Sequence, residues 1–563
     1  MAWRKRGNAR NITEAFKEIS RLSMEDVTLH KSVPSETIVG MEDAADLIDK
    51  AVRDKIPVTV VGDYDVDGIS STAILWYMLR YLGINAHLRL PRRYTEGYGL
   101  SMRVVDEVDE GLLITVDNGI AAIEPIRCAK EKGLRVIILD HHLPGKELPN
   151  ADVIVDPHIA PEQSGFSDYC GAGLAFKLSQ LLIDDNRFLK KMCALAAVGT
   201  IADVVPLVGD NHCIAREGLR YINQREIPVG LLALINATGL KKIDEQNIGF
   251  TIAPMLNAAG RLEDTGAEKS LELLIMEDYA EAEEKAYELI EINEKRKSLV
   301  KSAMERAHKY IRDNHMEEKN PICIYDQELL SGIAGLLAGR LAEEYQTPAI
   351  VLAPSGQEGT IKGSGRTYGG VHLRNLLESA EEYLLNYGGH EKAAGLGLRK
   401  GNLSSFTEKL ELLLKDYNRP EQGEYLYDLE VNAEEIPRIM EDLEKYAPFG
   451  EENPRPVIRV DRILLLPQAG KLYRLLGNQK EHIRLLGREF SVMAFHKAAE
   501  YIEMGEPDVI NVIGYLVHTN YRRNSQIEIE AIAFEESEKK ENESTALQQE
   551  MLLHFMQFAE ERR

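Results

Sequence analysis

The chain has 563 residues, of which 44% are hydrophobic and 28% are charged, and its formal net charge is −24. This length predicts three or four domains, because a single hydrophobic core rarely serves more than about 300 residues. The negative charge argues against non-specific nucleic-acid binding over the whole surface, so a nucleic-acid ligand would need a local basic groove.

Residues 1–44 are predicted to form a polar N-terminal segment. They carry positive charge but lack the apolar stretch of a secretory signal. No run of 18 apolar residues occurs, so we expect no membrane span and a cytoplasmic protein. The five cysteines are scattered and form no CxxC pair, which argues against a disulfide framework or a thiolate zinc site.

Residues 45–277 repeat one theme, in which a short apolar run is followed by a polar tip and then by a helical stretch. The apolar runs are Val58–Val61, Leu112–Val116, Val136–Leu139 and Val153–Val155. Strands that alternate with helices are typical of a parallel, doubly wound α/β sheet.

The rest of the chain divides by composition. Residues 278–315, rich in Ala, Glu and Lys, predict one long connecting helix. Residues 316–420 predict a second α/β domain, and the short strands of 425–535 predict a small β-barrel or sandwich. Residues 536–563 combine an acidic linker with an amphipathic C-terminal helix, which either docks on its own protein or binds a partner.

Candidate metal ligands follow several strands of the first domain. In a doubly wound sheet, ligands collect at the carboxyl ends of the strands, so these side chains are expected to converge. A cluster of carboxylates would be unstable without cations, and oxygen ligands with one or two imidazoles suit Mn²⁺ or Mg²⁺. Two such ions are a known device for phosphoester hydrolysis. The residues are Asp63, Asp65, Asp67, Asp117, Asp140, His141, His142 and Asp203.

Each of these aspartates has an ordinary structural explanation when taken alone. An Asp that follows a strand is commonly a helix N-cap or a turn former. Three alternating aspartates together with Asp-His-His on a neighbouring strand are much harder to explain in that way.

The motifs DYDVDG, VDNG, DHH and GTIADVVPL, in this order, resemble those of the DHH phosphoesterase family. The motifs PRRYTEGYGL, CGAGLAFKL, PMLNAAGRL, GSGRTYGG and GGHEKAAG resemble the RecJ exonucleases within that family. The resemblance implies a DHH domain, a long helix, a DHHA1-like substrate-binding domain and a C-terminal OB-fold barrel.

The resemblance also implies roles for individual residues. His142 would polarise the scissile phosphate or assist the leaving oxygen, and Asp140 would orient a histidine. Asp117 would be the carboxylate that bridges two divalent ions, whereas direct ligation by Asp63 or Asp65 stays open. The implied metal ligands are Asp63, Asp65, Asp67, Asp117, His141 and Asp203.

Substrate contacts are implied on both sides of a cleft between the two α/β domains. His390 would lie near the scissile phosphate, and a Gly-rich loop around Ser364 would let backbone amides approach an anion. Arginines can hold a terminal phosphate with two parallel hydrogen bonds. The implied set is Arg93, Asn257, Arg261, Ser364, Arg366 and His390, and the OB-fold candidates for DNA contact are Tyr473, Arg474, Tyr521, Arg522 and Arg523.

The sequence departs from the RecJ pattern in two places. PFGEENP has Glu451 and Glu452 where the family has the second glycine and its neighbour. Leu329 and Leu330 replace a Trp-His pair, which puts in doubt any DNA contact made by that pair.

Three hypotheses about function follow. The first is a metal-dependent 5′→3′ exonuclease that degrades single-stranded DNA to 5′-mononucleotides in repair and recombination, as a monomer, with a helicase and a single-strand-binding protein as candidate partners. The second is a phosphodiesterase for short oligonucleotides or cyclic dinucleotides. The third is a non-enzymatic scaffold that has lost its metals, which the complete set of motif carboxylates argues against.

Overall fold

The computed structural model describes residues 2–23, 27, 32–419, 424–467, 471–477, 479–487, 490–519 and 526–537. The chain divides into two compact units, Lys31–Glu421 and Met1–His30 with Gln422–Arg563. The predicted C-terminal helix lies outside the described residues. Among the helices that are described, none is both long enough and apolar enough to cross a membrane.

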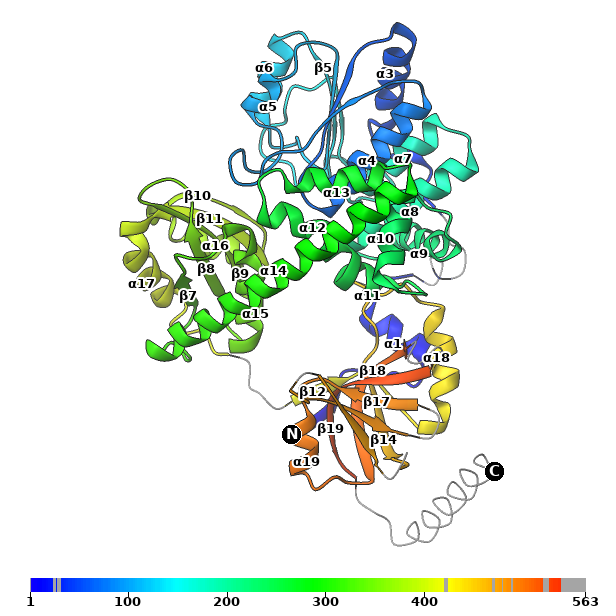
Figure 1. Cartoon of the computed structure of the whole chain (residues 1–563), viewed down its shortest axis with the longest axis vertical. Coiled ribbons are helices and arrows are strands. Elements are labelled where there is room, and N and C mark those ends of the chain that lie inside the picture. The colour runs from blue at the N-terminus through cyan, green and yellow to red at the C-terminus, as the bar shows by residue number, and fades with distance from the viewer. Residues whose placement is uncertain are drawn as a thin grey trace. The chain divides into compact units, whose positions relative to one another are not determined.

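The larger unit begins with a five-stranded parallel sheet in the order β3-β2-β4-β5-β6 (Figure 1). The chain starts in β2, adds β3 on one side and then continues with β4 on the other. Strand order therefore reverses between β2 and β4, which is where a doubly wound sheet binds its ligands. The strands are β2 (Val58–Val61), β3 (His87–Arg89), β4 (Leu112–Val116), β5 (Arg135–Leu139) and β6 (Val153–Val155).

Helices cover this sheet and extend beyond it. Helix α4 packs against both α7 and α8, and is therefore apolar on nearly all sides. The helices of this region are α3 (Met41–Asp54), α4 (Val66–Tyr81), α5 (Met102–Asp106), α6 (Ile123–Glu131), α7 (Gly171–Leu182), α8 (Asn186–Ala202), α9 (Gly209–Gln224), α10 (Val229–Thr238), α11 (Glu245–Asn247), a π-helical turn (Ile248–Ile252), α12 (Ala253–Leu262) and α13 (Gly266–Ile275).

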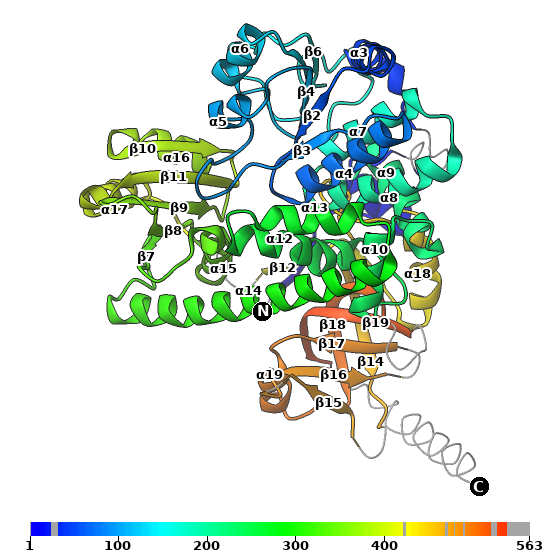
Figure 2. The ribbon, with the colours of Figure 1, turned by 45° about the horizontal axis from the view of Figure 1, so that its top comes forward.

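The predicted connecting helix is α14 (Tyr279–Asp313), 35 residues long and capped by the Asp278 carboxylate. It packs on α10, α12 and α13 and also contacts α15 (Ala334–Tyr345), so it runs from the first α/β domain to the second (Figure 2).

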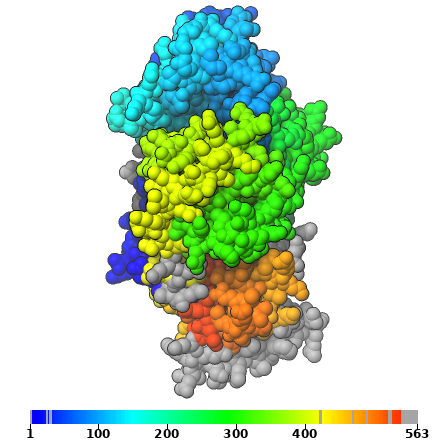
Figure 3. Space-filling model, turned by 90° about the vertical axis from the view of Figure 1, so that its left-hand side faces the viewer, coloured from blue at the N-terminus to red at the C-terminus, as the bar shows by residue number. Residues whose placement is uncertain are grey.

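The second α/β domain has a five-stranded sheet in the order β10-β11-β9-β8-β7, and it adjoins the first domain on the face seen in Figure 3. Ser364 and Arg366 lie within strand β9, whose backbone pairs with β8 and β11. The prediction of a loop that offers amides to an anion is therefore wrong, because the ladder already uses them. The elements are β7 (Ile322–Tyr325), β8 (Ala349–Pro354), β9 (Thr360–Arg366), α16 (Leu373–Glu378), β10 (Leu384–Gly389), β11 (Ala393–Arg399) and α17 (Leu403–Leu413).

The smaller unit contains a seven-stranded mixed sheet in the order β13-β14-β18-β19-β17-β16-β15. Its apolar side chains form a main buried core and a smaller cluster around Tyr427, Val457 and Ile513. Its elements are β12 (Glu424–Tyr427), β13 (Leu429–Val431), α18 (Ile436–Glu444), β14 (Ile458–Leu464), β15 (Tyr473–Leu476), β16 (His482–Leu486), β17 (Phe490–Ala494), α19 (Ala498–Glu503), β18 (Val509–Thr519) and β19 (Gln526–Glu536).

The N-terminus belongs to this smaller unit. Strand β1 (Ala2–Lys5) pairs in parallel with β12, and α1 (Ile12–Ile19) stacks Phe16 on Tyr446 with ring centroids 3.9 Å apart. The predicted N-terminal segment 1–44 is thus divided, since its last part, including the start of α3, lies in the larger unit.

The two departures from the RecJ pattern have distinct surroundings. Glu452 adopts a left-handed φ of 57°, a conformation that favours glycine. Its carbonyl accepts a hydrogen bond from the Arg21 amide at 2.8 Å, and its carboxylate pairs with the Arg21 guanidinium. Leu329 is buried in the core of the second domain, whereas Leu330 is exposed.

Candidate active site

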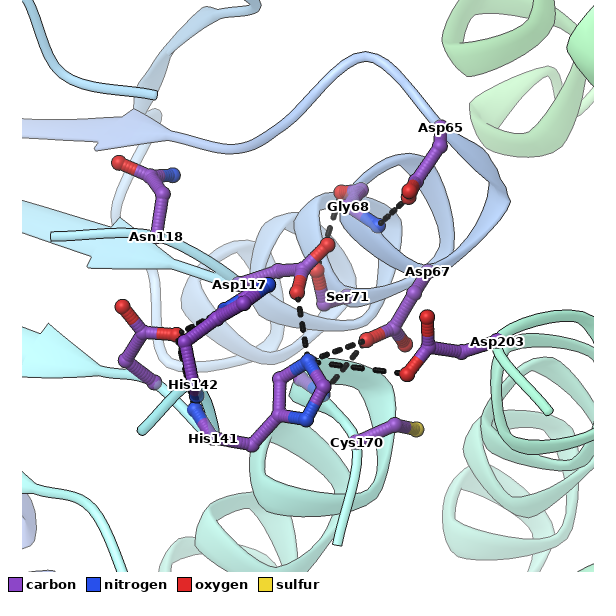
Figure 4. Close-up of polar contacts among 12 residues, drawn as sticks. Asp65, Asp67, Gly68, Ser71, Asp117, Asn118, His141, His142, Cys170 and Asp203 are labelled. Atoms are coloured by element: carbon purple, nitrogen blue, oxygen red, sulfur yellow. Dashed lines mark hydrogen bonds and ion pairs between the residues drawn. The ribbon is translucent and has the colours of Figure 1, made fainter. Parts of the chain in front are cut away.

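The carboxyl ends of three adjacent strands bring the predicted metal ligands together (Figure 4). The DYDVD carboxylates follow β2 and enter α4, Asp117 follows β4, and the Asp-His-His motif follows β5. Asp203 reaches the same place from the C-terminal end of α8. Residues far apart in sequence therefore converge at the point where strand order reverses.

The imidazole of His141 lies at the centre of three carboxylates (Figure 4). Its Nε2 atom is 3.1 Å from Asp117 Oδ1, 3.7 Å from Asp203 Oδ2 and 3.8 Å from Asp67 Oδ2. Burial and the charge of His142 lower the pKa of His141 to about 3, so its ring is neutral. A neutral imidazole surrounded by carboxylates is the donor set of a divalent metal site.

The ligand atoms form three overlapping groups, in each of which all atoms lie within 4.8 Å of one another. Asp117 and His141 each belong to two of these groups, and of the two only the carboxylate has two oxygens with which to bridge a pair of ions. The groups are Asp117 with His141 and His142, Asp67 with His141 and Asp203, and Asp63 with Asp65 and Asp117.

Without cations this cluster is electrostatically unfavourable. Burial, together with neighbouring carboxylates, raises the pKa of Asp63, Asp117 and Asp203 well above the ordinary value and that of Asp67 to about 6. The Asp63 Oδ1 atom is also buried without a hydrogen-bond partner among the described residues. An acidic cluster with an unused buried oxygen fits divalent ions with oxygen ligands.

Asp63 and Asp65 differ in what else their oxygens do. Asp65 is the N-cap of α4 and accepts a hydrogen bond from the Gly68 amide at 3.1 Å. A Cβ atom at Gly68 would lie 2.5 Å from the Asp63 carbonyl oxygen, so the entry into α4 requires glycine there. Asp65 thus has the structural role of a cap, whereas Asp63 keeps an unpaired oxygen.

Asp67 is held by the first turn of α7. Its two oxygens accept hydrogen bonds from the amides of Gly171 at 2.7 Å and Ala172 at 2.8 Å. The positive end of the helix dipole thereby faces the metal cluster. These supporting residues were not predicted from the sequence, although they lie in the motif CGAGLAFKL.

His142 and Asp140 form a second, differently charged pair beside the cluster. The Asp140 Oδ1 atom lies 2.7 Å from His142 Nδ1, and Asp140 also accepts hydrogen bonds from the Ile120 amide at 2.9 Å and the His141 amide at 2.8 Å. Burial alone would lower the pKa of His142, but Asp140 and nearby carboxylates raise it to about 9. His142 is therefore suited to carry a proton at neutral pH.

Asp140→Asn is expected to reduce kcat/KM about 10- to 100-fold, because residues that orient catalytic or ligating histidines typically have effects of this size. Asparagine keeps an acceptor for the backbone amides but loses the charge that holds the His142 proton. Steady-state kinetics on a single strand would measure the loss. The double variant Asp140→Asn/His142→Ala should be no slower than His142→Ala alone, and a further full loss would contradict action through His142.

Two further residues at this site were missed in the sequence. Tyr98, half-exposed, donates its hydroxyl to the Asp117 carbonyl oxygen at 2.9 Å and lies 3.1 Å from the ring nitrogens of His142. Asn118 is buried and bonds Val61 O, Val116 O and the Leu100 amide. Tyr98 lies in the motif PRRYTEGYGL and Asn118 in VDNG, so their place in these motifs could have indicated a role at the site.

A cluster of arginine side chains, which we call the cationic pocket, lies close to the acidic cluster. The Arg93 guanidinium stacks over the Tyr64 ring at 3.8 Å from its centroid, and Arg261 donates to the Gly332 carbonyl at 3.4 Å. Burial and the charges of Arg93, Arg296 and Arg366 lower the pKa of Arg261 to about 10. Such mutual repulsion is relieved when an anion binds.

The other predicted substrate contacts fall near this pocket. Asn257 lies one helical turn before Arg261 on α12, and its Oδ1 atom is buried without a partner among the described residues. Arg366 points along α15, because a Cβ at Gly335 would lie 2.9 Å from its guanidinium. Arg296, on α14, was not predicted from the sequence.

His390 follows strand β10 in the second domain and lies close enough to His142 to be affected by its charge. Burial, then the charges of His142 and Arg374, lower its pKa, so the imidazole is neutral and senses the charge of His142. Ser364 lies on β9, half-buried, at the alternate position to Arg366.

The surroundings of the candidate DNA contacts in the smaller unit do not indicate DNA binding. The Tyr473 hydroxyl donates to Glu506 at 2.9 Å, and its ring meets Tyr501 edge-on, so this side chain has a structural role. Arg474 lies in β15. Tyr521, Arg522 and Arg523 lie outside the described residues.

Comparison with known protein families agrees with this geometry. The DHH family, N-terminal domain, matches residues 57–200, the DHHA1 domain matches residues 320–416, and the RecJ OB domain matches residues 427–533.

Individual relatives agree as well. The single-stranded-DNA-specific exonuclease RecJ of Salmonella typhimurium is 32% identical over 485 residues, which cover 81% of this chain and 82% of the relative. RecJ of Bacillus subtilis is 32% identical over 88% of this chain, which spans only 64% of that longer relative. The crystal structure of RecJ from Thermus thermophilus with Mn²⁺ superposes with a TM-score of 0.77 at 28% identity, covering 96% of this chain and 80% of that chain. The same protein with Mg²⁺ gives 0.71 at 26% identity, covering 96% and 79%. By its domains, its motifs and these relatives, the chain belongs to the RecJ family of DHH phosphoesterases.

Proposed function

We propose that this chain is a metal-dependent exonuclease that degrades single-stranded DNA from its 5′ end and releases 5′-mononucleotides. The observation that carries the proposal is a cluster of carboxylates around His141 that lies close to a cluster of arginines. The two sets of side chains lie close enough to affect each other's pKa values. The charge of Arg93 opposes the burial that raises the pKa of Asp63, and Asp65 opposes the burial that lowers the pKa of Arg261.

Two divalent ions, Mn²⁺ or Mg²⁺, would be held by the DHH-motif carboxylates and His141, with Asp117 shared between them. When bound, such ions activate water and stabilise charge on the attacking and leaving oxygens of a phosphodiester. The ligand set is Asp63, Asp65, Asp67, Asp117, His141 and Asp203.

The protein's own residues then do three things. His142, protonated through Asp140, donates a hydrogen bond to the scissile phosphate or to the leaving oxygen. His390 approaches the same phosphate from the second domain. The backbone amides in the first turn of α7 hold the Asp67 carboxylate in place during the reaction.

The 5′→3′ direction of cleavage would follow from binding of the 5′ end in the cationic pocket. A terminal phosphate carries more negative charge than an internal diester, and guanidinium groups bind it through paired hydrogen bonds. If Arg93, Arg261 and Arg366 hold the 5′ phosphate, with Asn257 and Ser364 beside them, the first phosphodiester falls next to the metal pocket. A single nucleotide is then removed in each cycle.

The decisive experiment is digestion of one single strand labelled at its 5′ end or at its 3′ end, with Mn²⁺, Mg²⁺ or EDTA. Rapid release of a labelled mononucleotide from the 5′-labelled strand alone, and only with metal, is expected. Release first from the 3′ label, or cleavage in EDTA, would refute the proposal. A duplex and a dinucleotide serve as controls, and faster turnover of the dinucleotide would favour an oligonucleotide phosphodiesterase.

We further propose that the enzyme acts in DNA repair and recombination, as a monomer in the cytoplasm. A helicase that exposes single strands and a single-strand-binding protein that covers them are its candidate partners.

A further inference from the structure

Strand β9 carries Ser364 and Arg366, which are expected phosphate contacts, and it also carries a further cation, Lys362. Side chains at alternate positions of a strand share a face, so Lys362 lies on the same face as Ser364 and Arg366. Arg366 on this face lies against α15, and the Lys362 Nζ atom lies 5.3 Å from the ring centroid of Tyr94.

Lys362 lacks the partner that a partly buried ammonium normally has. Within the described parts of the chain, it forms no ion pair and no hydrogen bond through its side chain. The carboxylate that influences it, Asp264, already accepts hydrogen bonds from the Tyr94 amide at 2.8 Å and from the Thr95 hydroxyl at 2.7 Å. Burial and the like charge of Arg93 lower the pKa of Lys362, so its charge is under-compensated.

Tyr94 connects this ammonium to the cationic pocket. Its hydroxyl donates to the Arg261 carbonyl oxygen, and its neighbour in sequence is Arg93. Tyr94 therefore links Lys362 to the backbone of Arg261 and lies next to Arg93, whose charge acts on Lys362.

Lys362 is remote from the catalytic histidines. Arg366 pairs with Ala393, whose carbonyl accepts the His390 amide at 2.8 Å, whereas Lys362 pairs with Gly397. Four steps along the strand, or roughly 13 Å of β9, separate the two residues. Lys362 thus lies at the end of the row away from His390.

We propose that Lys362 is a specificity-determining residue that recognises the additional negative charge of a phosphorylated 5′ end. This inference rests on the proposed 5′-exonuclease function. A 5′-monophosphate and a 5′-triphosphate both end in a phosphate group that carries more negative charge than an internal diester, and either could be recognised by Lys362.

The test compares wild type, Lys362→Gln and Lys362→Arg on one single strand with a 5′-hydroxyl, a 5′-monophosphate or a 5′-triphosphate. Lys362→Gln should raise KM about tenfold for a phosphorylated end, with kcat and the 5′-hydroxyl parameters unchanged, and Lys362→Arg should restore most of the difference. Fluorescence anisotropy in EDTA should give the same ratio of Kd values without catalysis. A loss confined to the triphosphate would assign Lys362 to phosphates beyond the first.

Lys400→Gln is the matched control. Lys400 also places its ammonium over a tyrosine ring, that of Tyr325, with Nζ 4.9 Å from the centroid, but it is exposed and contacts a different tyrosine from Lys362. It should leave end preference unchanged. Equal effects of Lys362→Gln on all three ends, or none on any, would overturn the inference. Wild type that degrades strands without end preference would also overturn it while leaving the nuclease function intact, whereas inactive wild type would refute the function itself.

Discussion

Replacing Asp117 with alanine is expected to abolish cleavage of single-stranded DNA while binding of the strand persists. Asp117 belongs to two of the three groups of potential ligands, so its loss removes a carboxylate that both groups share. Metal stabilisation of a phosphoryl transition state is worth several kcal/mol, which corresponds to a rate loss of at least about 10³-fold. Strand affinity should stay within roughly threefold, because the cationic pocket is a separate set of groups.

Product release from a labelled strand and anisotropy of the same strand would measure the two properties together. Asp117 has a φ of 60°, which alanine tolerates less well than aspartate, so Asp117→Asn is the second variant because it keeps both shape and backbone preference. Asp109→Ala, at an exposed aspartate before β4, is the control and should be fully active. Substantial cleavage by both Asp117 variants would contradict a shared metal ligand.

The metal-free protein is expected to become more stable as pH falls from 8 to 6. The folded-state pKa values of four cluster aspartates are raised by burial and mutual repulsion, that of Asp67 to about 6, so the folded state binds more protons than the unfolded state in this range. Stability therefore falls as pH rises through these values. His142, raised to about 9, acts in the same direction, since stability from its protonated form is lost as pH rises. His141, whose pKa is lowered to about 3, acts in the opposite direction below about pH 6.5, but it is one group against four aspartates and His142.

Thermal unfolding in EDTA, followed by calorimetry of the larger unit, should show a Tm about 3–6 °C higher at pH 6 than at pH 8. Mn²⁺ should stabilise the protein at pH 8 and have a smaller effect at pH 6, because protons compete for the same carboxylates. Asp117→Asn in EDTA should raise the Tm at pH 8, since it removes one of the repelling charges. A Tm in EDTA that is flat or falls on acidification would exclude an electrostatically strained, empty cluster.

Much of the catalytic site could be predicted from local sequence. Each ligand directly follows an apolar run or an apolar helix, and the carboxyl ends of parallel strands necessarily share one edge of the sheet. That rule predicted the convergence of Asp63, Asp117 and His141 without any knowledge of distances. The long connecting helix was equally predictable, because its composition favours helix along 35 residues.

The supporting contacts were not predictable in the same way. The amides that hold Asp67 come from α7, and whether a backbone amide faces a carboxylate depends on how two helices pack. The setting of Ser364 and Arg366 was wrong for a related reason: the glycines of GSGR indicate a loop locally, yet pairing with β8 and β11 makes this segment a strand. Tertiary pairing outweighed local propensity there.

By itself, the sequence determined the order of the domains, the chemical nature of the ligand set and its placement at the strand ends, because these depend on residue type and on hydrophobic periodicity. Only the tertiary structure decided which oxygens are free, with Asp65 capping α4 while Asp63 keeps an unpaired atom. It likewise joined the N-terminal strand to the C-terminal unit and left Lys362 without an ion pair among the described residues. These outcomes depend on contacts between residues distant in the chain, and no local pattern specifies such contacts.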